Sequence, residues 1–384
     1  MIDVLVVGGG PVGLAAAIRC AMAGLSVTVA EPRSAPIDKA CGEGVMPAAV
    51  RRLAALGVAP DGHPLRGISY RDDRHQADAR FRHGDGMGVR RTVLQAALGE
   101  RAAELGIPVL PARVTMFERH QDHVTAAGVE ARYLVAADGL HSVIRRLLDR
   151  EPRAAGRGLD DRSAATRRAP RPGHPGRGAR APAARYGLRR HYRMAPWTDL
   201  VEVHLAADAE AYVTPVSPDV VGIAVLFARD GSARGRLPDD PAEQSGHLHG
   251  FEALVSAFPA LRGRLAGAAP ASGVRGAGPL RQDVRRRVHG RVLLVGDASG
   301  YLDALTGEGI GVGLAQAEVL AACLAAGRPE EYEGAWRKVS SPAWRLTAGL
   351  LWSRNQPLLS ARIVPAAQHL PWLFAAIVNR VADA

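Results

Sequence analysis

Apolar runs alternate with a helical pattern at the start of the chain. Ile2–Val7 is an apolar run of the kind expected for a parallel strand that is buried on both faces. Leu14–Ala23 is rich in alanine and predicts a helix, and Ser26–Ala30 predicts a second short strand. Strand, helix and strand within about 30 residues make a βαβ unit. The chain is therefore predicted to open an α/β domain around a parallel sheet.

The same alternation returns further along. Apolar residues at helical spacing predict a helix over Arg91–Leu105, followed by a strand near Ile107–Leu110. Tyr133–Ala137 and Val288–Val295 are predicted as buried strands, and Gly311–Ala325 as an apolar helix. These segments extend the α/β domain discontinuously along the chain.

The middle of the chain has a different pattern. Several short strands of alternating character predict a small, mostly antiparallel sheet inserted into the larger fold, over Tyr186–Met194, Leu200–Leu205, Ala211–Val216 and Val220–Phe227. The tail, Trp344–Val381, predicts amphipathic helices that carry Trp352, Trp372 and Phe374. The fold class is thus α/β, a Rossmann-like domain with an inserted sheet and a helical C-terminal tail.

One segment fits neither pattern. Nearly every residue of Glu151–Arg185 is Arg, Ala, Pro or Gly, and Leu159 is its only large aliphatic residue. Such a stretch cannot bury enough apolar surface to fold. Two interpretations stay open, a disordered basic loop and an altered reading frame in a GC-rich coding sequence.

Composition narrows the function classes. The chain has 384 residues, is 47% hydrophobic and contains 43 glycines, which suits a globular α/β enzyme. The net charge of +11 suggests an acidic partner, but much of it lies in Glu151–Arg185, and no recognition helix or aromatic-basic sheet pattern supports nucleic-acid binding. Three separated cysteines predict neither a disulfide scaffold nor a metal site. No signal peptide or membrane span is predicted, so we expect a cytoplasmic protein.

The first chemical motif is a glycine turn between the first strand and helix. Gly8, Gly10 and Gly13 form GxGxxG together with Pro11 and Val12, and this placement lets a pyrophosphate rest on the helix N-terminus. Glu31 ends the next strand, where a carboxylate accepts hydrogen bonds from ribose hydroxyls. Arg33 could reach the same ribose or the adenine. The pattern predicts a bound dinucleotide.

Two later motifs specify which one. Tyr133–Arg146 contains Asp138-Gly139, and Arg291–Ile310 contains Gly296-Asp297 followed by Thr306-Gly307-Glu308-Gly309. In this order and spacing the three motifs resemble the class A flavoprotein monooxygenases, of the hydroxybenzoate hydroxylase type, and the related geranylgeranyl reductases. The resemblance covers nearly the whole chain apart from Glu151–Arg185. It implies FAD as the cofactor, with NADPH or NADH as a transient reductant.

The resemblance also implies roles for single residues. Asp297 looks like the aspartate that binds the FAD ribityl chain, and the turn through Gly307, Glu308, Gly309 and Ile310 would face the pyrimidine end of the flavin, where a helix N-terminus favours negative charge. Arg91 resembles the arginine near the FAD phosphates, with Arg90 as its competitor. Asp138 either binds cofactor or orients the Arg145 region.

The loop Lys39–Pro47 is similar to the cysteine–glycine segment that lies against the flavin in the reductases. Cys41 and Gly42 are therefore candidate cofactor contacts, and Cys41 and Glu43 are the candidate catalytic residues, with packing or surface roles as the alternative. His191, His204 and Tyr212 lie on the predicted sheet and are candidate substrate contacts, although no spacing singles one out.

Three functions remain. The first is a monooxygenase in which NAD(P)H reduces FAD, O2 adds at the flavin C4a carbon, and the hydroperoxide hydroxylates or epoxidises a hydrophobic small molecule. The second is reduction of isoprenoid or polyene double bonds, and the third is flavin binding without turnover. The lipophilic tail also admits peripheral membrane contact.

The predicted division of the chain follows from these motifs. The FAD-binding domain takes residues 1–68, 88–150 and 278–335, and the substrate domain takes 69–87 and 186–277. Residues 151–185 are the basic segment, and 336–384 are the helical C-terminal region.

Overall fold

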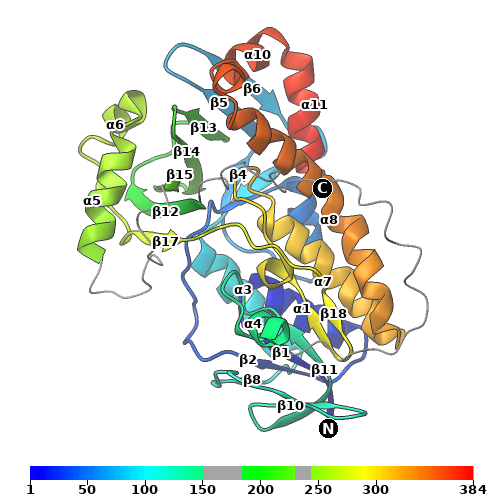
Figure 1. Ribbon diagram of the computed structural model, residues 1–384. Coiled ribbons are helices and arrows are strands. Elements are labelled where there is room, and N and C mark those ends of the chain that lie inside the picture. The colour runs from blue at the N-terminus through cyan, green and yellow to red at the C-terminus, as the bar shows by residue number, and fades with distance from the viewer. Residues whose placement is uncertain (151–183, 230–243, 384) are drawn as a thin grey trace, which may run out of the picture.

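The computed structural model describes residues 1–150, 184–229 and 244–383 (Figure 1). Its first sheet is the predicted parallel core. β1 (Ile2–Val7) pairs in parallel with β2 (Val27–Ala30) and with β11 (Val129–Ala136), and the spatial order is β18-β19-β11-β1-β2-β8. The remaining strands of this sheet are β8 (Val109–Leu110), β9 (Glu118–Arg119), β10 (Val124–Ala126), β18 (Val288–His289) and β19 (Val292–Leu294).

Helices cover one face of this sheet and a smaller layer covers the other. On the first face lie α1 (Pro11–Met22), α2 (Pro47–Ala54), α3 (Arg91–Glu104) and α7 (Gly309–Ala325). On the second face, α4 (Val143–Arg150) packs with the β9–β10 hairpin. Apolar runs between two covered faces explain why residues 4–7 of β1 and residues 133–136 of β11 are buried. The predicted fold class is confirmed.

One predicted strand was wrong in detail. Val288–Val295 is not a single strand but a hairpin, in which β18 and β19 pair antiparallel through Val288 with Leu293 and His289 with Val292. Gly290 lies at the turn with φ +64°, a conformation that suits glycine. The apolar run therefore hid a reversal of the chain, and only β19 joins the parallel sheet.

The second sheet is the inserted one, and its order is β16-β12-β15-β14-β13-β5-β6. Its neighbouring strands pair antiparallel among the described residues, except that β13 and β5 are parallel. Helices α5 (Gln244–Val255) and α6 (Pro259–Leu265) cover one face (Figure 1). The strands are β5 (Gly67–Arg71), β6 (Gln76–Arg80), β12 (Ala184–Arg193), β13 (Leu200–Leu205), β14 (Ala209–Ser217), β15 (Val220–Arg229), β16 (Ala269–Pro270) and β17 (Arg275–Ala277).

The predicted basic segment ends earlier than its composition suggested. Residues 151–183 lie outside the described residues, but Ala184 and Arg185 already belong to β12. The Arg185 guanidinium pairs with Glu210 at 2.5 Å and with Asp303 at 2.9 Å. Buried carboxylates need such a partner, so Arg185 is part of the folded sheet rather than of the low-complexity segment.

The chain ends in helices that close the sheet on the side of β5 and β6. α8 (Tyr332–Arg354) runs along α7, and α10 (Ile363–His369) and α11 (Pro371–Ala382) pack against β6 (Figure 1). Asn379 links α11 to β6 and the residues that follow it. Its side-chain amide donates to the Arg80 carbonyl at 3.1 Å and accepts from the Arg82 N–H at 2.8 Å. The remaining described elements are α9 (Pro357–Ser360), the 3-10 helices η2 (Gly296–Ser299) and η3 (Pro329–Glu331), and a three-stranded sheet of β3 (Gly44–Val45), β4 (His63–Leu65) and β7 (Gly86–Gly88). Among the described helices, none has the length and apolar character to cross a bilayer.

Candidate functional site

A large cavity runs between the two sheets. Its volume is about 1210 Å³, and its lining extends from the Gly8–Val12 turn to the C-terminal helices. Pockets for one small ligand are commonly about 300–1000 Å³. This cavity therefore has room for a large cofactor and a second ligand, and its two ends differ in chemistry.

At the polar end lies the glycine turn, and the three glycines serve different purposes. A Cβ on Gly13 would lie 1.9 Å from the Gly8 carbonyl oxygen, and one on Gly8 would lie 2.5 Å from the Ala137 oxygen, so the fold itself requires glycine at both positions. A Cβ on Gly10 would meet only Arg91 Nη2, at 3.7 Å. Gly10 therefore leaves open a space that the protein itself does not fill.

Glu31 directly follows β2, beside this turn. Its carboxylate accepts the Gly9 N–H at 2.8 Å and pairs with the Arg33 side chain at 2.8 Å. Burial disfavours the ionised form, but the hydrogen bonds from Arg33 and Gly9 outweigh it and lower the pKa of Glu31. An ionised acceptor thus stands at the rim of the cavity, where a ribose would present its hydroxyls.

The structure separates the two arginines at the start of α3, the N-cap Arg90 and the first helical residue Arg91. Arg91 lines the cavity and its guanidinium lies near Gly10, whereas Arg90 is not among the lining residues. The Nε atoms of Arg90 and Arg91 are both buried without a hydrogen-bond partner among the described residues, so it is the place of Arg91 on the cavity wall that separates the two. Asp138 also lines the cavity. Its Oδ2 accepts the Val143 N–H at 2.7 Å at the start of α4, while its Oδ1 is buried without a partner in the described part of the chain.

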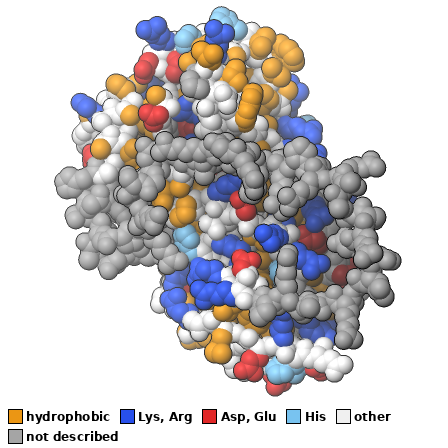
Figure 2. Space-filling model, in the orientation of Figure 1, with side chains coloured by type: hydrophobic (Ala, Val, Ile, Leu, Met, Phe, Trp, Pro, Cys, Tyr) orange, Lys and Arg blue, Asp and Glu red, His pale blue; other side chains and the backbone are white. Residues whose placement is uncertain are grey.

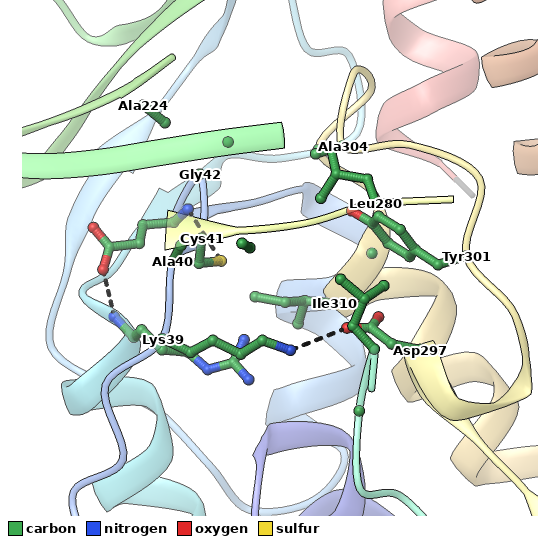
Figure 3. Close-up of a pocket in the computed structure, with 18 of the residues that line it drawn as sticks. Lys39, Ala40, Cys41, Gly42, Ala224, Leu280, Asp297, Tyr301, Ala304 and Ile310 are labelled. Carbon is green, nitrogen blue, oxygen red and sulfur yellow. Dashed lines mark hydrogen bonds and ion pairs between the residues drawn. The ribbon is translucent and has the colours of Figure 1, made fainter. Parts of the chain in front are cut away.

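The third motif forms the opposite wall of this end. Asp297 follows β19, and its carboxylate lies 3.6 Å from the Lys39 amine across the cavity (Figure 3). Gly307 and Gly309 line the wall, with Gly307 at φ +67° and Gly309 opening α7. Glu308 points away into a small adjoining pocket, where burial raises its pKa to about 7.

The Cys41 loop crosses the centre of the cavity, facing Tyr301, Leu280 and Ala304 (Figure 3). It is tied to the second sheet, because the Thr214 hydroxyl donates to the Gly42 carbonyl at 2.8 Å. Glu43 adopts φ +60°, which is uncommon for a residue with a side chain. Its buried carboxylate contacts His191 Nε2 at 2.5 Å and accepts the Arg91 N–H at 2.9 Å.

The far end of the cavity is an apolar chamber under the second sheet. The alternation of side chains along β15 explains why this face of the sheet lines a chamber. Val221, Ile223 and Val225 face α5 and α6. Ala224 and Leu226, which lie between and after them, face the cavity. The chamber is lined by Ile68, Tyr70, Val201, Val203, Tyr212, Ala224, Leu226 and, from the C-terminal helices, Leu350, Ile363, Ala366, Ala367, Leu370, Leu373, Phe374, Ile377, Val378 and Val381.

The three candidate substrate residues therefore have different surroundings. Tyr212 lines the chamber, and its hydroxyl donates to the Leu305 carbonyl at 3.0 Å. His191 lies behind Glu43 and is not among the lining residues. His204 is next to Val203 on β13, so it faces the other way and pairs with Glu202 at 3.0 Å.

The predicted cofactor residues converge on the polar end. All of them line the cavity except Gly13, which packs against Gly8, and Glu308. Sequence reasoning missed Lys39, Tyr301 and the chamber residues of α10 and α11. Lys39 is the first residue of the Lys39–Pro47 loop, and the C-terminal tail is visibly apolar in the sequence. Neither feature indicates that these residues face a cavity.

These features fit a dinucleotide with an extended diphosphate. The Gly10 space, the unpartnered Arg91 Nε and Asp138 Oδ1, and the ionised Glu31 are the donors, acceptors and room that such a group needs. A family model described as the FAD binding domain matches residues 1–160. Over these residues the chain is therefore similar to the FAD-binding domains of flavoproteins.

The relatives of this flavoprotein have names that describe different activities. The chain is 28% identical to a dialkyldecalin synthase of Streptomyces rugosporus over 341 residues, which are 84% of this chain and 65% of the synthase. It is 33% identical to the protoasukamycin 4-monooxygenase of Streptomyces nodosus subsp. asukaensis over 181 residues, 38% of this chain and 43% of that enzyme. The chain thus spans less than two thirds of either relative.

The fold is also seen in solved structures. A flavoprotein/dehydrogenase from Cytophaga hutchinsonii superposes with a TM-score of 0.76 at 17% identity and covers all of this chain and 93% of its own. At that identity the likeness concerns the fold alone.

Proposed function

We propose that this flavoprotein is a monooxygenase that uses NAD(P)H and O2 to hydroxylate or epoxidise a hydrophobic small molecule. The observation that carries the proposal is the continuity of the cavity: the cradle for FAD opens directly into the apolar chamber. A substrate held there would lie against the part of the cofactor that faces the Cys41 loop. The protoasukamycin 4-monooxygenase supports the reaction class.

Bound FAD would take two electrons from NAD(P)H and activate O2, while the chain's own residues hold and shield the reactants. Gly10, Arg91 and Asp297 would hold the cofactor, with Lys39 and Asp297 spanning the cavity beside it. Aliphatic residues such as Val203 and Leu226 would exclude water and hold an apolar substrate by burial.

The proposal is tested by following NADPH oxidation by the FAD-loaded protein with and without O2. A naphthol, an anthrone and a linear polyene ester serve as substrates of increasing length. Oxygen-dependent NADPH oxidation and transfer of one atom of 18O2 to a product are expected. Equal rates without O2 and no labelled product would overturn it, and saturation of the polyene under anaerobic conditions would favour a double-bond reductase.

A second function has a specific observation in its favour. The relative that matches 84% of this chain is a dialkyldecalin synthase. A decalin consists of two fused carbocycles, and closing such rings from a polyene by cycloaddition needs a shaped apolar chamber but no electrons. Ring closure of a polyene ester by protein that holds oxidised FAD, without NADPH or O2, would establish this function in place of the first.

We also propose that the C-terminal helices contact an anionic membrane surface. Leu370 and Leu373 line the chamber and are also exposed, and Trp372 beside them is 68% exposed. Apolar side chains gather at this end of the molecule, over α10 and α11 (Figure 2). Residues 334–382 contain no Asp or Glu, and their exposed positive residues are Arg337, Lys338, Arg345, Arg362 and Arg380. Arg354 is largely buried and pairs with Glu210. Exposed apolar side chains can insert among lipids, and neighbouring basic side chains are attracted to anionic headgroups.

Vesicle co-sedimentation tests this contact. Binding to vesicles that contain phosphatidylglycerol, little binding to pure phosphatidylcholine, and a loss with Trp372→Ser are expected. Met116→Ser is the matched control, because Met116 is 65% exposed and lies far from the C-terminal helices in sequence. Equal binding of both variants, or none by the parent chain, would contradict the contact.

A further inference from the structure

A row of polar side chains leads from the centre of the cavity into the second sheet. Glu43 Oε2 lies 2.5 Å from His191 Nε2, and His191 Nδ1 lies 2.8 Å from the Ser272 hydroxyl. The Glu43 and His191 side chains are 2% and 1% exposed. They come from positions 148 residues apart, so the contact joins the Cys41 loop to β12.

The neighbouring arginine fixes where the protons lie. Arg189 Nη1 is 3.2 Å from His191 Nδ1. A guanidinium can only donate, so Nδ1 must be an acceptor and the imidazole proton lies on Nε2. His191 Nε2–H therefore donates to the Glu43 carboxylate. The Ser272 hydroxyl accepts the His191 backbone N–H at 3.1 Å, which leaves its own proton free to donate to Nδ1 or to the Gly273 carbonyl.

One end of the row lies at the cavity and the other lies near the protein surface. Glu43 lines the cavity, where its left-handed backbone and the Arg91 N–H hold the carboxylate in place. Ser272 is partly exposed and precedes the exposed Gly273. Other charged groups surround the row. Arg189 contacts Asp38, which also accepts from Arg275 at 3.4 Å, and the Lys39 carbonyl accepts from Arg189 at 3.2 Å.

We propose that Glu43, His191 and Ser272 form a proton path between the solvent and the cavity. A histidine can take a proton at one ring nitrogen and release one from the other. Here Nδ1 would give up the Arg189 contact and receive a proton through Ser272, while Nε2 passes its own to Glu43, which presents it to the cavity. The ring would then return to its Nε2–H form before the next turnover. In this arrangement Glu43 faces the reactants, and His191 and Ser272 act through it.

The path has a use under the proposed function, on which this inference rests. NAD(P)H, O2, one proton and the substrate become NAD(P)⁺, water and the hydroxylated product. The nicotinamide supplies two electrons, one oxygen atom forms the new C–O bond, and the other leaves as water. Each turnover therefore consumes one proton from solvent, and a chamber with aliphatic walls does not supply it. The row provides that supply without admitting bulk water.

The first test follows proton uptake, which needs neither substrate nor O2. Two-electron reduction of bound FAD draws protons from solution, so anaerobic flash photoreduction with a pH-indicator dye reports how fast they arrive. Ser272→Ala and His191→Gln should take up protons more slowly than the parent protein. Ser256→Ala, another exposed serine whose hydroxyl donates to a carbonyl, should not. Equal uptake rates in all four proteins would overturn the path.

A second readout separates the path from a merely structural pair. In the FAD-loaded protein, the 15N signals of His191, assigned by their loss in His191→Gln, should show a neutral ring protonated on Nε2. A ring protonated on Nδ1 would overturn the assignment. Glu43→Gln should lower the rate of the proton-consuming step by roughly 10²-fold, the usual size of general acid catalysis, and Glu43→Asp should restore part of it. If the proposed oxygenase function is wrong but the path is right, no 18O will be transferred to a product, while proton uptake will still be slowed by Ser272→Ala and His191→Gln.

Discussion

Replacing Gly10 by alanine separates what the fold requires from what the cofactor requires. In the protein alone, the new Cβ would meet nothing closer than Arg91 Nη2 at 3.7 Å, an ordinary contact. Gly10 has φ −72°, which alanine adopts without strain. The FAD-free variant should therefore unfold at the same temperature as the parent protein. With FAD bound, the methyl group would occupy the space assigned to the pyrophosphate.

The size of the effect follows from overpacking. A methyl group forced into a filled site costs about 1–3 kcal/mol, which corresponds to a rise in the FAD Kd of roughly 5- to 150-fold. Gly13→Ala is the contrasting variant, because its Cβ would lie 1.9 Å from the Gly8 oxygen and must displace backbone even without FAD. It should lower the melting temperature of the FAD-free protein.

The assay is a titration of FAD fluorescence against FAD-free protein, paired with thermal unfolding of the same samples. If Gly10→Ala bound FAD as tightly as the parent, the diphosphate could not lie against this turn. A large loss of stability in FAD-free Gly10→Ala would refute the inference that the protein leaves the space beside Gly10 unfilled.

Three further predictions concern other parts of the cavity. Arg91→Ala should raise the FAD Kd by at least about tenfold, as expected for a lost charge-assisted contact, whereas Arg90→Ala should leave it nearly unchanged; equal effects would reject the assignment. Burial raises the pKa of Glu308 from 4.5 to about 7, so this carboxyl stabilises the fold least above pH 7. Glu308→Gln should accordingly raise the melting temperature of FAD-free protein at pH 8 more than at pH 5, and a pH-independent gain would contradict the shift. Ala224→Phe should block long substrates from the chamber while FAD still binds normally, as measured by the KM for a polyene ester and by FAD titration.

Local chemistry made much of the FAD cradle predictable. The glycine turn, β1 and the motif around Asp297 each carry their own short-range signal, and Gly8 and Gly13 are indeed required by backbone contacts. The hairpin at Gly290 was missed because an apolar run looks the same whether or not it reverses.

The centre of the site depends on contacts that no local pattern contains. Glu43 and His191 were each singled out separately, one for proton handling and one as a substrate contact. Their pairing arises only when β12 folds over the Cys41 loop. The chamber likewise depends on α10 and α11 docking against β6, and amphipathic helices alone do not indicate what they cover.

The measurement that tests the central claim most directly is the FAD content of the purified chain. After reconstitution with FAD and gel filtration, the protein should carry one FAD per chain, with a flavin absorption spectrum that changes when an apolar ligand enters the chamber. Protein that elutes colourless after exposure to excess FAD would contradict the account, since every proposed role of the cavity starts from that cofactor.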